Sequence, residues 1–156
     1  MEGPGLALVD VDRDAPVVAE AEAEIAADPE TVWDVLTGFE TWPSWNPDAA
    51  WVSFDGAVEE GAVFRWKAGR ATITSTLRQV ERPTFIGWTG KTIGIRAVHV
   101  WHLEPRGGGT HVKTEESWQG ILVRILRGRM QKNLEGVLED GLKRLGAEAE
   151  RRAQLG

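Results

Sequence analysis

The sequence predicts a single α+β domain, in which a seven-stranded antiparallel sheet wraps around one long C-terminal helix. Two patterns carry this prediction. Residues 17–25 and 49–119 alternate between apolar and polar side chains, which is typical of strands with one buried face. After Gly120, apolar residues recur at helical spacing with charged residues between them. A length of 156 residues favours one domain, which we expect to span residues 17–152 after a flexible tail over residues 1–16.

The first strand and the short helices after it follow from local signals. In the segment 17–25, Val and Ala occupy one face and three Glu the other. Asp28 followed by Pro29 is a typical helix start, and Gly38 is expected to end this helix in a left-handed conformation. Two prolines in the next segment, ETWPSWNP, prevent a long helix. We therefore expect a Trp-rich loop or a broken helical turn before the second strand.

Residues 49–119 are interpreted as six strands joined by short connections. Paired residues of a hairpin share a face, so the turns predict which side chains lie together. The face that carries the large apolar side chains is the inner one. The outer face carries Thr72, Thr74, Thr76 and Arg78. The first two turns predict these pairs: Trp66 with Ala71, Phe64 with Ile73, Leu77 with Trp88, and Gln79 with Ile86.

The last hairpin turns at Gly107 and Gly108, two residues that readily adopt the positive φ of a tight turn. A loop of two or four residues gives the same register. It predicts these pairs: Leu103 with Val112, Trp101 with Thr114, His99 with Glu116, and Ala97 with Trp118.

The C-terminal helix is expected to lie with one apolar face against the sheet. Three glycines in this segment, Gly128, Gly136 and Gly141, each cost about 1 kcal/mol relative to Ala. They indicate a bend or a close backbone approach. The apolar stripe comprises Ile121, Ile125, Met130, Leu134, Val137, Leu138, Gly141, Leu142 and Leu145.

Composition excludes several classes of function. A net charge of −6 disfavours nucleic acid as a partner, and the absence of cysteine excludes thiolate nucleophiles, iron–sulfur clusters and disulfides. No segment has the pattern of a secretory leader or a membrane span, so we expect a cytoplasmic protein. Eight Trp and four Phe without any Tyr indicate that a wide apolar interior is filled or lined.

Two segments carry a resemblance to a known family. The segment IAADPETVWDVLTGFETWPSWNP resembles the opening signature of the polyketide-cyclase-like branch of the SRPBCC superfamily, the START-like domains, and VHVWHLEPRGGGTHVKTEESWQG resembles its last hairpin. The likeness covers about residues 17–150, and the order of elements is that of the helix-grip fold. The resemblance implies an apolar cavity between sheet and helix that takes lipids, quinones, hormones or polyketides. Catalysis occurs in only some branches, so the fold does not determine the function.

Within such a fold, the inner face of the sheet forms the wall of a ligand cavity. The alternative is that the same Trp side chains fill a solid core. Trp42 and Trp45 are candidates for a portal. The candidate ligand-binding residues are Phe64, Trp66, Ile73, Leu77, Ile86, Trp88, Trp101, Thr114, Trp118, Met130 and Leu134.

His99 and Glu116 are the two titratable residues expected on the inner wall, with Cβ atoms about 5 Å apart. Three roles are open to such a pair. The two groups can satisfy each other's hydrogen bonds as a buried polar pair, they can bind a ligand by hydrogen bonds, or they can act as an acid–base pair in catalysis. His102 and His111 are expected on the outer face, in contact with solvent. One inner His and one Glu are too few ligands for zinc, so we predict no metal site, and no motif indicates a cofactor.

A basic cluster without acids follows the last strand, formed by Arg124, Arg127, Arg129 and Lys132. It is interpreted as a solvated helix face or as a docking site for an anionic headgroup or a membrane surface. Three functions follow from these observations. The first is binding of a hydrophobic small molecule, the second is a cyclase or dehydratase that uses His99 and Glu116, and the third is a protein-interaction module. The sequence carries no signature of oligomeric state.

Overall fold

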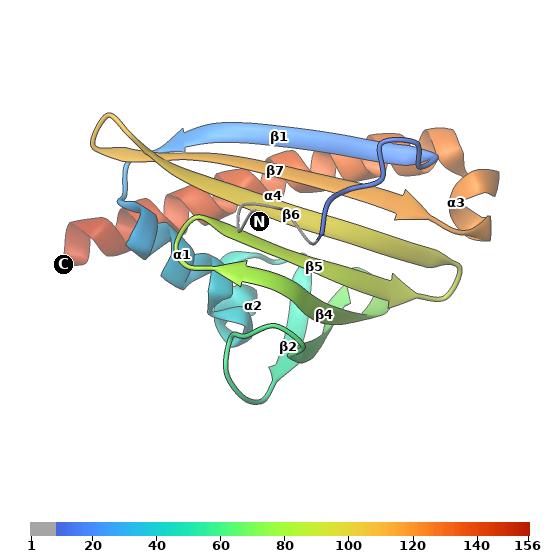
Figure 1. Ribbon diagram of the computed structural model, residues 1–156, viewed down its shortest axis with the longest axis horizontal. Coiled ribbons are helices and arrows are strands. Elements are labelled where there is room, and N and C mark those ends of the chain that lie inside the picture. The colour runs from blue at the N-terminus through green and yellow to red at the C-terminus, as the bar shows by residue number, and fades with distance from the viewer. Residues whose placement is uncertain (1–8) are drawn as a thin grey trace, which may run out of the picture.

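The computed structural model describes residues 9–156 and contains one seven-stranded antiparallel sheet with the long helix α4 along one face (Figure 1). The strand order is β1-β7-β6-β5-β4-β3-β2. This is the helix-grip α+β fold that the sequence predicts. The elements are β1 (Val17–Ile25), α1 (Pro29–Thr37), the 3-10 helix η1 (Phe39–Thr41), α2 (Trp42–Trp45), β2 (Ala49–Phe54), β3 (Val63–Ala68), β4 (Ala71–Glu81), β5 (Phe85–Thr92), β6 (Ile95–Arg106), β7 (Gly109–Gln119), α3 (Ile121–Ile125) and α4 (Arg127–Leu155).

Strand β1 is where α4 packs most closely on the sheet. Val17 and Ala19 face the helix and pack against Leu134 and Leu138. Alanine is a poor strand former, but its small side chain lets the helix axis come close to the sheet. The residues of β1 thus act as a seat for α4, and their Glu neighbours lie on the opposite face.

The predicted register of the last hairpin is confirmed. Strands β6 and β7 meet in a two-residue turn at Gly107 and Gly108, both with positive φ. All four predicted pairs occur, including His99 with Glu116 and Ala97 with Trp118.

The predicted register of β3 and β4 is wrong by two residues, because the chain turns at Gly69–Arg70 and not one residue earlier. Trp66 pairs with Ile73, and Phe64 pairs with Ser75. A shift of two residues keeps every side chain on its predicted face. The inner face of this hairpin is therefore the expected one, although the partners differ.

Strand β4 contains a bulge that the sequence analysis did not predict. Leu77 pairs with Trp88 as expected, but the register then shifts, so that Val80 rather than Gln79 pairs with Ile86. One extra residue in a strand reverses the alternation of faces beyond it. Gln79 consequently reaches the outer face, where it accepts a hydrogen bond from the backbone amide of Val9.

The short helices between β1 and β2 form as predicted, with one difference. Asp28 caps α1 by accepting a hydrogen bond from the amide of Thr31, and the Trp-rich segment forms the broken turn η1–α2. Gly38 does not adopt a left-handed conformation, since its φ is −77°. Glycine instead avoids a close contact at this position, because a Cβ there would lie 3.0 Å from the carbonyl oxygen of Asp34.

The C-terminal segment is two helices, since the chain breaks at Leu126 between α3 and α4. Because α3 is a separate helix, Ile121 and Ile125 do not continue the buried stripe of α4 and are exposed, contrary to the prediction. Val137 of α4 is exposed as well. The close approach suggested for three helix glycines is also wrong. A Cβ would meet no atom within 4 Å at the positions Gly128, Gly136 and Gly141.

The described part of the predicted N-terminal tail lies on the outer face of the sheet. Val9 and Val11 are buried against Phe85 and Val100, and Arg13 forms an ion pair with Glu115. Residues 1–8, the rest of that prediction, lie outside the described residues. In residues 9–156, no helix has the length and apolarity needed to cross a bilayer.

Candidate functional site

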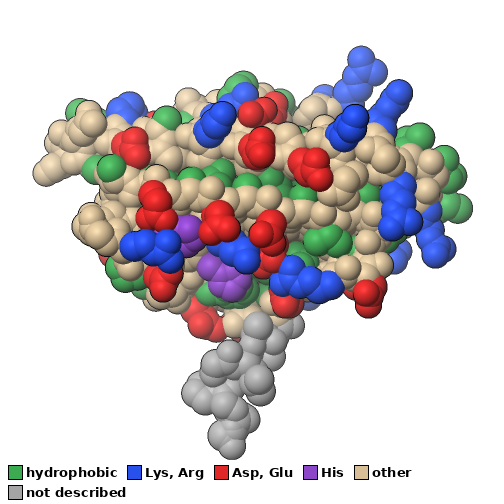
Figure 2. All heavy atoms as spheres, turned by 90° about the horizontal axis from the view of Figure 1, so that it is seen from above, with side chains coloured by type: hydrophobic (Ala, Val, Ile, Leu, Met, Phe, Trp, Pro, Cys, Tyr) green, Lys and Arg blue, Asp and Glu red, His purple; other side chains and the backbone are tan. Residues whose placement is uncertain are grey.

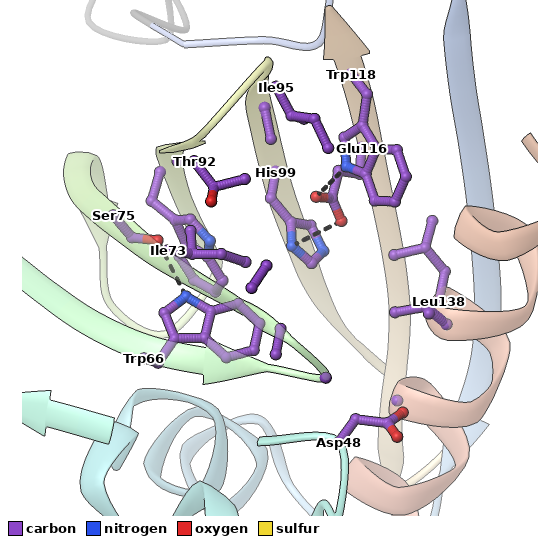
Figure 3. A pocket seen from close by; sticks show the side chains of 18 of the residues that line it. Asp48, Trp66, Ile73, Ser75, Thr92, Ile95, His99, Glu116, Trp118 and Leu138 are labelled. Atoms are coloured by element: carbon purple, nitrogen blue, oxygen red, sulfur yellow. Dashed lines mark hydrogen bonds and ion pairs between the residues drawn. The ribbon is translucent and has the colours of Figure 1, made fainter. Parts of the chain in front are cut away.

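A cavity of about 410 Å³ lies between two parts of the hydrophobic core. One part joins the inner face of β3–β6 to α1, η1 and α2, and includes Phe39, which stacks on Phe64 with ring centroids 4.3 Å apart. The other part joins β1 and β7 to the first half of α4. In Figure 3 the side chains of Trp66 and Ile73 border the cavity opposite Glu116 and Trp118, with Leu138 of α4 at its side.

Many of the predicted wall residues line this cavity. Trp66, Ile73, Trp88, Trp101, Trp118 and Met130 do so, together with His99 and Glu116. Both portal candidates, Trp42 and Trp45, also belong to the lining.

The remaining predicted wall residues lie behind the cavity surface. The four strand residues lie on the predicted face of the sheet and the fifth lies on the buried face of α4, but all five are fully buried and do not reach the cavity. These residues are Phe64, Leu77, Ile86, Thr114 and Leu134.

Sequence reasoning missed the lining residues that come from loops, strand ends and α4. Exposed residues among them show that the cavity reaches the surface: Asp48, Gly69, Lys91, Asn133 and Val137. Gly141 had a detectable signal, because a glycine on the apolar stripe of a helix leaves space. In the structure that space is part of the cavity.

Two indole nitrogens at the cavity have no hydrogen-bond partner. Nε1 of Trp101 and Nε1 of Trp45 are buried and unpaired among residues 9–156. Three other Trp donors near the cavity are paired. Nε1 of Trp66 lies 3.2 Å from Oγ of Ser75, and those of Trp42 and Trp118 donate to the carbonyl oxygen of Leu36 and to Glu116. A buried donor without an acceptor costs about 1–3 kcal/mol, so these two groups are unusual.

His99 and Glu116 face one another across β6 and β7, with Nδ1 of His99 3.2 Å from Oε1 of Glu116. Their side chains are 15% and 14% exposed, and both line the cavity. His99 lies between the rings of Trp88 and Trp101, at centroid distances of 5.2 and 5.0 Å. Register, burial and aromatic neighbours thus place one polar pair in an apolar wall (Figure 3).

A chain of hydrogen bonds fixes which atoms carry protons. The hydroxyl of Thr114 donates to the carbonyl oxygen of Val100, so its oxygen accepts from Nε2 of His99. A neutral His99 protonated at Nε2 presents a bare Nδ1, which accepts a hydrogen bond from the protonated carboxyl group of Glu116. The second carboxyl oxygen of Glu116 accepts from Nε1 of Trp118.

Burial gives the same protonation states. It lowers the pKa of His99 to about 3, which keeps the imidazole neutral. Burial also raises the pKa of Glu116 to about 7, and the hydrogen bond from Trp118 opposes this shift. Below neutral pH the pair is therefore uncharged and fully hydrogen-bonded.

The other histidines lie on the outer face as predicted, but His111 is not simply solvated. Its ring is held between Glu22 and Glu24 of the neighbouring strand β1. His102 is exposed and contacts the ring of Phe85. Within residues 9–156, no three His, Asp or Glu side chains are grouped as a metal site.

Comparison with known proteins identifies the family. The family model described as "Polyketide cyclase / dehydrase and lipid transport" matches residues 16–150. Among curated proteins, none matches the chain significantly in sequence.

Solved structures share the fold at low identity. A hypothetical protein from Helicobacter pylori superposes with a TM-score of 0.79 at 13% identity, over 92% of this chain and 98% of that one. A START superfamily protein from Mycobacterium smegmatis gives a TM-score of 0.63 at 18% identity, over 88% and 97%. The di-domain ARO/CYC StfQ from the steffimycin biosynthetic pathway gives 0.75 at 16% identity, over 88% of this chain and 52% of that one. These structures show the fold, and the family model covers most of the chain, so the protein belongs to the polyketide cyclase/dehydrase and lipid transport family within the SRPBCC superfamily.

Proposed function

We propose that the protein binds an uncharged, largely apolar small molecule that carries at least one hydrogen-bond acceptor oxygen. The observation that carries this proposal is the pair of unpaired indole donors, Trp45 and Trp101, in the wall of a 410 Å³ cavity. Both nitrogens are covered by neighbouring atoms, so a bound carbonyl, ether or hydroxyl oxygen would reach them after a shift of the indole side chains. Lipids, quinones and polyketides are molecules of this kind.

The charge state of the wall supports an uncharged ligand. Because His99 is neutral and Glu116 holds its proton below about pH 7, no fixed charge at this pair compensates an ionic ligand. An ion moved into an apolar cavity without a partner loses its hydration at high cost. The paired groups also use both oxygens of Glu116 internally, so the pair offers a ligand no free carboxyl oxygen.

Two probes with the same ring system test the role of the indole donors. Menadione is a methylated naphthoquinone with two carbonyl oxygens, and 2-methylnaphthalene is the corresponding hydrocarbon. Both would be titrated against bound Nile red, followed by energy transfer from Trp. The absence of cysteine prevents covalent addition of menadione to a thiol. We expect Trp101→Phe to weaken menadione about 2- to 12-fold, the range of one hydrogen bond, and to leave 2-methylnaphthalene nearly unchanged.

A pair of helix variants tests where the probes bind. Gly141→Leu projects a side chain into the cavity, whereas Gly136→Leu lies on the exposed part of α4, away from the cavity lining. Both variants replace a helix glycine with a better helix former, so both should fold. We expect Gly141→Leu to abolish Nile red binding and Gly136→Leu to retain it. Equal binding in the two variants, or no binding to the unaltered protein, would contradict the proposal.

Acid–base catalysis is the second candidate function, since Glu116 is a proton donor poised near neutral pH in the cavity wall. A substrate oxygen or carbon within hydrogen-bond reach of the pair could exchange a proton with it. Turnover that disappears in both Glu116→Gln and His99→Ala, with probe affinity retained, would establish this role. Retained turnover in either variant would exclude it.

A further inference from the structure

One end of the molecule presents an unusual number of apolar side chains to solvent. Of the nine exposed large hydrophobic residues in the described part of the chain, five lie on α3, just after it, or in the adjacent turn between β5 and β6. Ile93 is 92% exposed, Ile121 72% and Ile125 71%. Figure 2 shows hydrophobic and basic side chains gathered at one end of the molecule. The five residues, here called the apolar tip, are Ile93, Ile121, Leu122, Ile125 and Leu126.

Close packing of glycines holds the two parts of the apolar tip together. The amide of Leu122 donates to the carbonyl oxygen of Gly94, 3.3 Å away. A Cβ on Gly120 would lie 2.2 Å from that same oxygen, so only glycine allows this contact. Val123, the one buried residue of α3, anchors the helix in the core. The exposure of its neighbours is therefore a fixed feature of the fold.

Basic residues surround the apolar tip and no acid follows them until Glu135. Arg124, Arg129 and Lys132 make no ion pair with any residue in 9–156, although the chain as a whole has a net charge of −6. The first turn of α4 has no acidic residue and no side-chain cap. The partial positive charge at the N-terminus of this helix therefore adds to the charge of the basic side chains. The surface is thus amphipathic and positive. Two further cations, Lys91 and Arg96, flank the β5–β6 turn.

The apolar tip also adjoins the cavity. Thr92 and Ile95, on either side of the turn, belong to the cavity lining, as does Met130 in the first turn of α4. Figure 3 places Thr92 and Ile95 at the cavity beside His99. One end of the cavity therefore lies directly beneath this surface.

We propose that the apolar tip and its basic surround dock on the surface of an anionic lipid bilayer. Isoleucine and leucine side chains would enter the acyl–headgroup boundary, and the unpaired cations would contact the phosphates of anionic headgroups. The combination of exposed apolar groups with unpaired positive charge fits this partner better than an apolar protein surface, which would leave the cations unmatched. This docking goes beyond ligand binding and does not depend on it.

Co-sedimentation with sucrose-loaded vesicles tests the proposal. The unaltered protein should bind vesicles that contain phosphatidylglycerol, release at high salt, and bind pure phosphatidylcholine vesicles weakly. Arg124→Gln with Arg129→Gln should reduce the partition coefficient about 25-fold, at about fivefold per charge. The matched control, Arg65→Gln with Arg70→Gln, removes two exposed cations elsewhere and should reduce binding far less.

A second pair of variants tests the apolar contribution. Ile121→Ser with Ile125→Ser should abolish binding, whereas Val63→Ser with Leu155→Ser, which removes exposed apolar groups elsewhere, should not. All variants should retain Nile red, which separates this proposal from ligand binding in the cavity. Equal vesicle binding by variant and control, or no binding by the unaltered protein, would overturn it. So would a stable dimer in analytical ultracentrifugation that Ile121→Ser with Ile125→Ser dissociates, because the tip would then be a protein interface.

Discussion

Glu116 is the residue whose protonation sets the character of the cavity wall. Its carboxyl group donates to Nδ1 of His99 and accepts from Nε1 of Trp118, and burial raises its pKa to about 7. Glutamine has the same size and can make both bonds without a proton, with its NH₂ group toward His99 and its oxygen toward Trp118. Glutamine at this position is therefore a neutral mimic of the protonated state.

This mimicry predicts a pH-dependent stability difference. The pKa of Glu116 is raised on folding, so the contribution of this group to the stability of the wild type falls as pH rises from about 4.5 to about 7, while the contribution of His99 is common to both proteins. Glu116→Gln has no such loss. We expect its advantage in unfolding free energy to grow by about 1.4 kcal/mol per pH unit across this window and to stay constant above it.

Urea unfolding at several pH values would measure this advantage. Glu40→Gln makes the same substitution at an exposed position, so it is the control for the effect of the charge change alone on the unfolding free energy. An advantage of Glu116→Gln that stays constant as pH rises from 5 to 7 would show that Glu116 is already ionised in the folded protein.

At the scale of single residues, the sequence is sufficient to predict which residues pair across a hairpin when a tight turn sets the register. The two glycines at 107 and 108 place His99 opposite Glu116, because register propagates along a regular hairpin. The sequence does not reveal that Nε1 of Trp101 is left unpaired. That property depends on the positions of acceptors from several elements, which no pairing rule determines.

At the scale of elements, breaks in regularity account for the incorrect predictions. In β4, Leu77 and Val80 both face the core although they are three residues apart, so the apolar spacing itself signals the bulge at this point. The break between α3 and α4 at Leu126 has a weaker signal, namely the bend that Gly128 suggests two residues later, since neither proline nor a capping side chain marks the break. The seat for α4 on β1, in contrast, follows directly from the period-two pattern of Ala and Glu.

Gly94 shows how the β5–β6 turn and α3 depend on one another. Its φ is +76°, and a Cβ would lie 2.9 Å from Cβ of Leu122. Gly94→Ala should cost about 1–2 kcal/mol for the left-handed backbone and more for displacing α3. Gly107→Ala is the matched control, because its φ is +59° with no atom near the added Cβ. Urea unfolding should show a larger loss for Gly94→Ala, and equal losses would mean that α3 moves freely.

At the scale of the whole molecule, the sheet separates two environments. Its inner face holds the cavity, and its outer face is covered in part by residues 9–15, which precede the segment matched by the family model. Gly87 makes room for this segment, since a Cβ there would lie 2.6 Å from Cγ1 of Val9. Arg13 lowers the pKa of the buried carboxyl of Glu115 by a hydrogen bond and an ion pair. The segment therefore satisfies both apolar and charged groups of the outer face.

This separation predicts that stability and ligand binding respond independently to changes on the outer face. Val9→Ser with Val11→Ser removes two buried side chains and exposes Phe85 and Val100, so the unfolding free energy should fall by about 2–4 kcal/mol. Val63→Ser, at an exposed position, should change it by less than about 0.5 kcal/mol. Nile red affinity at temperatures well below unfolding should be the same in all three proteins, because the sheet lies between the two regions. A Val9→Ser, Val11→Ser protein that stays folded yet loses Nile red would show that the outer segment holds the cavity in its binding shape.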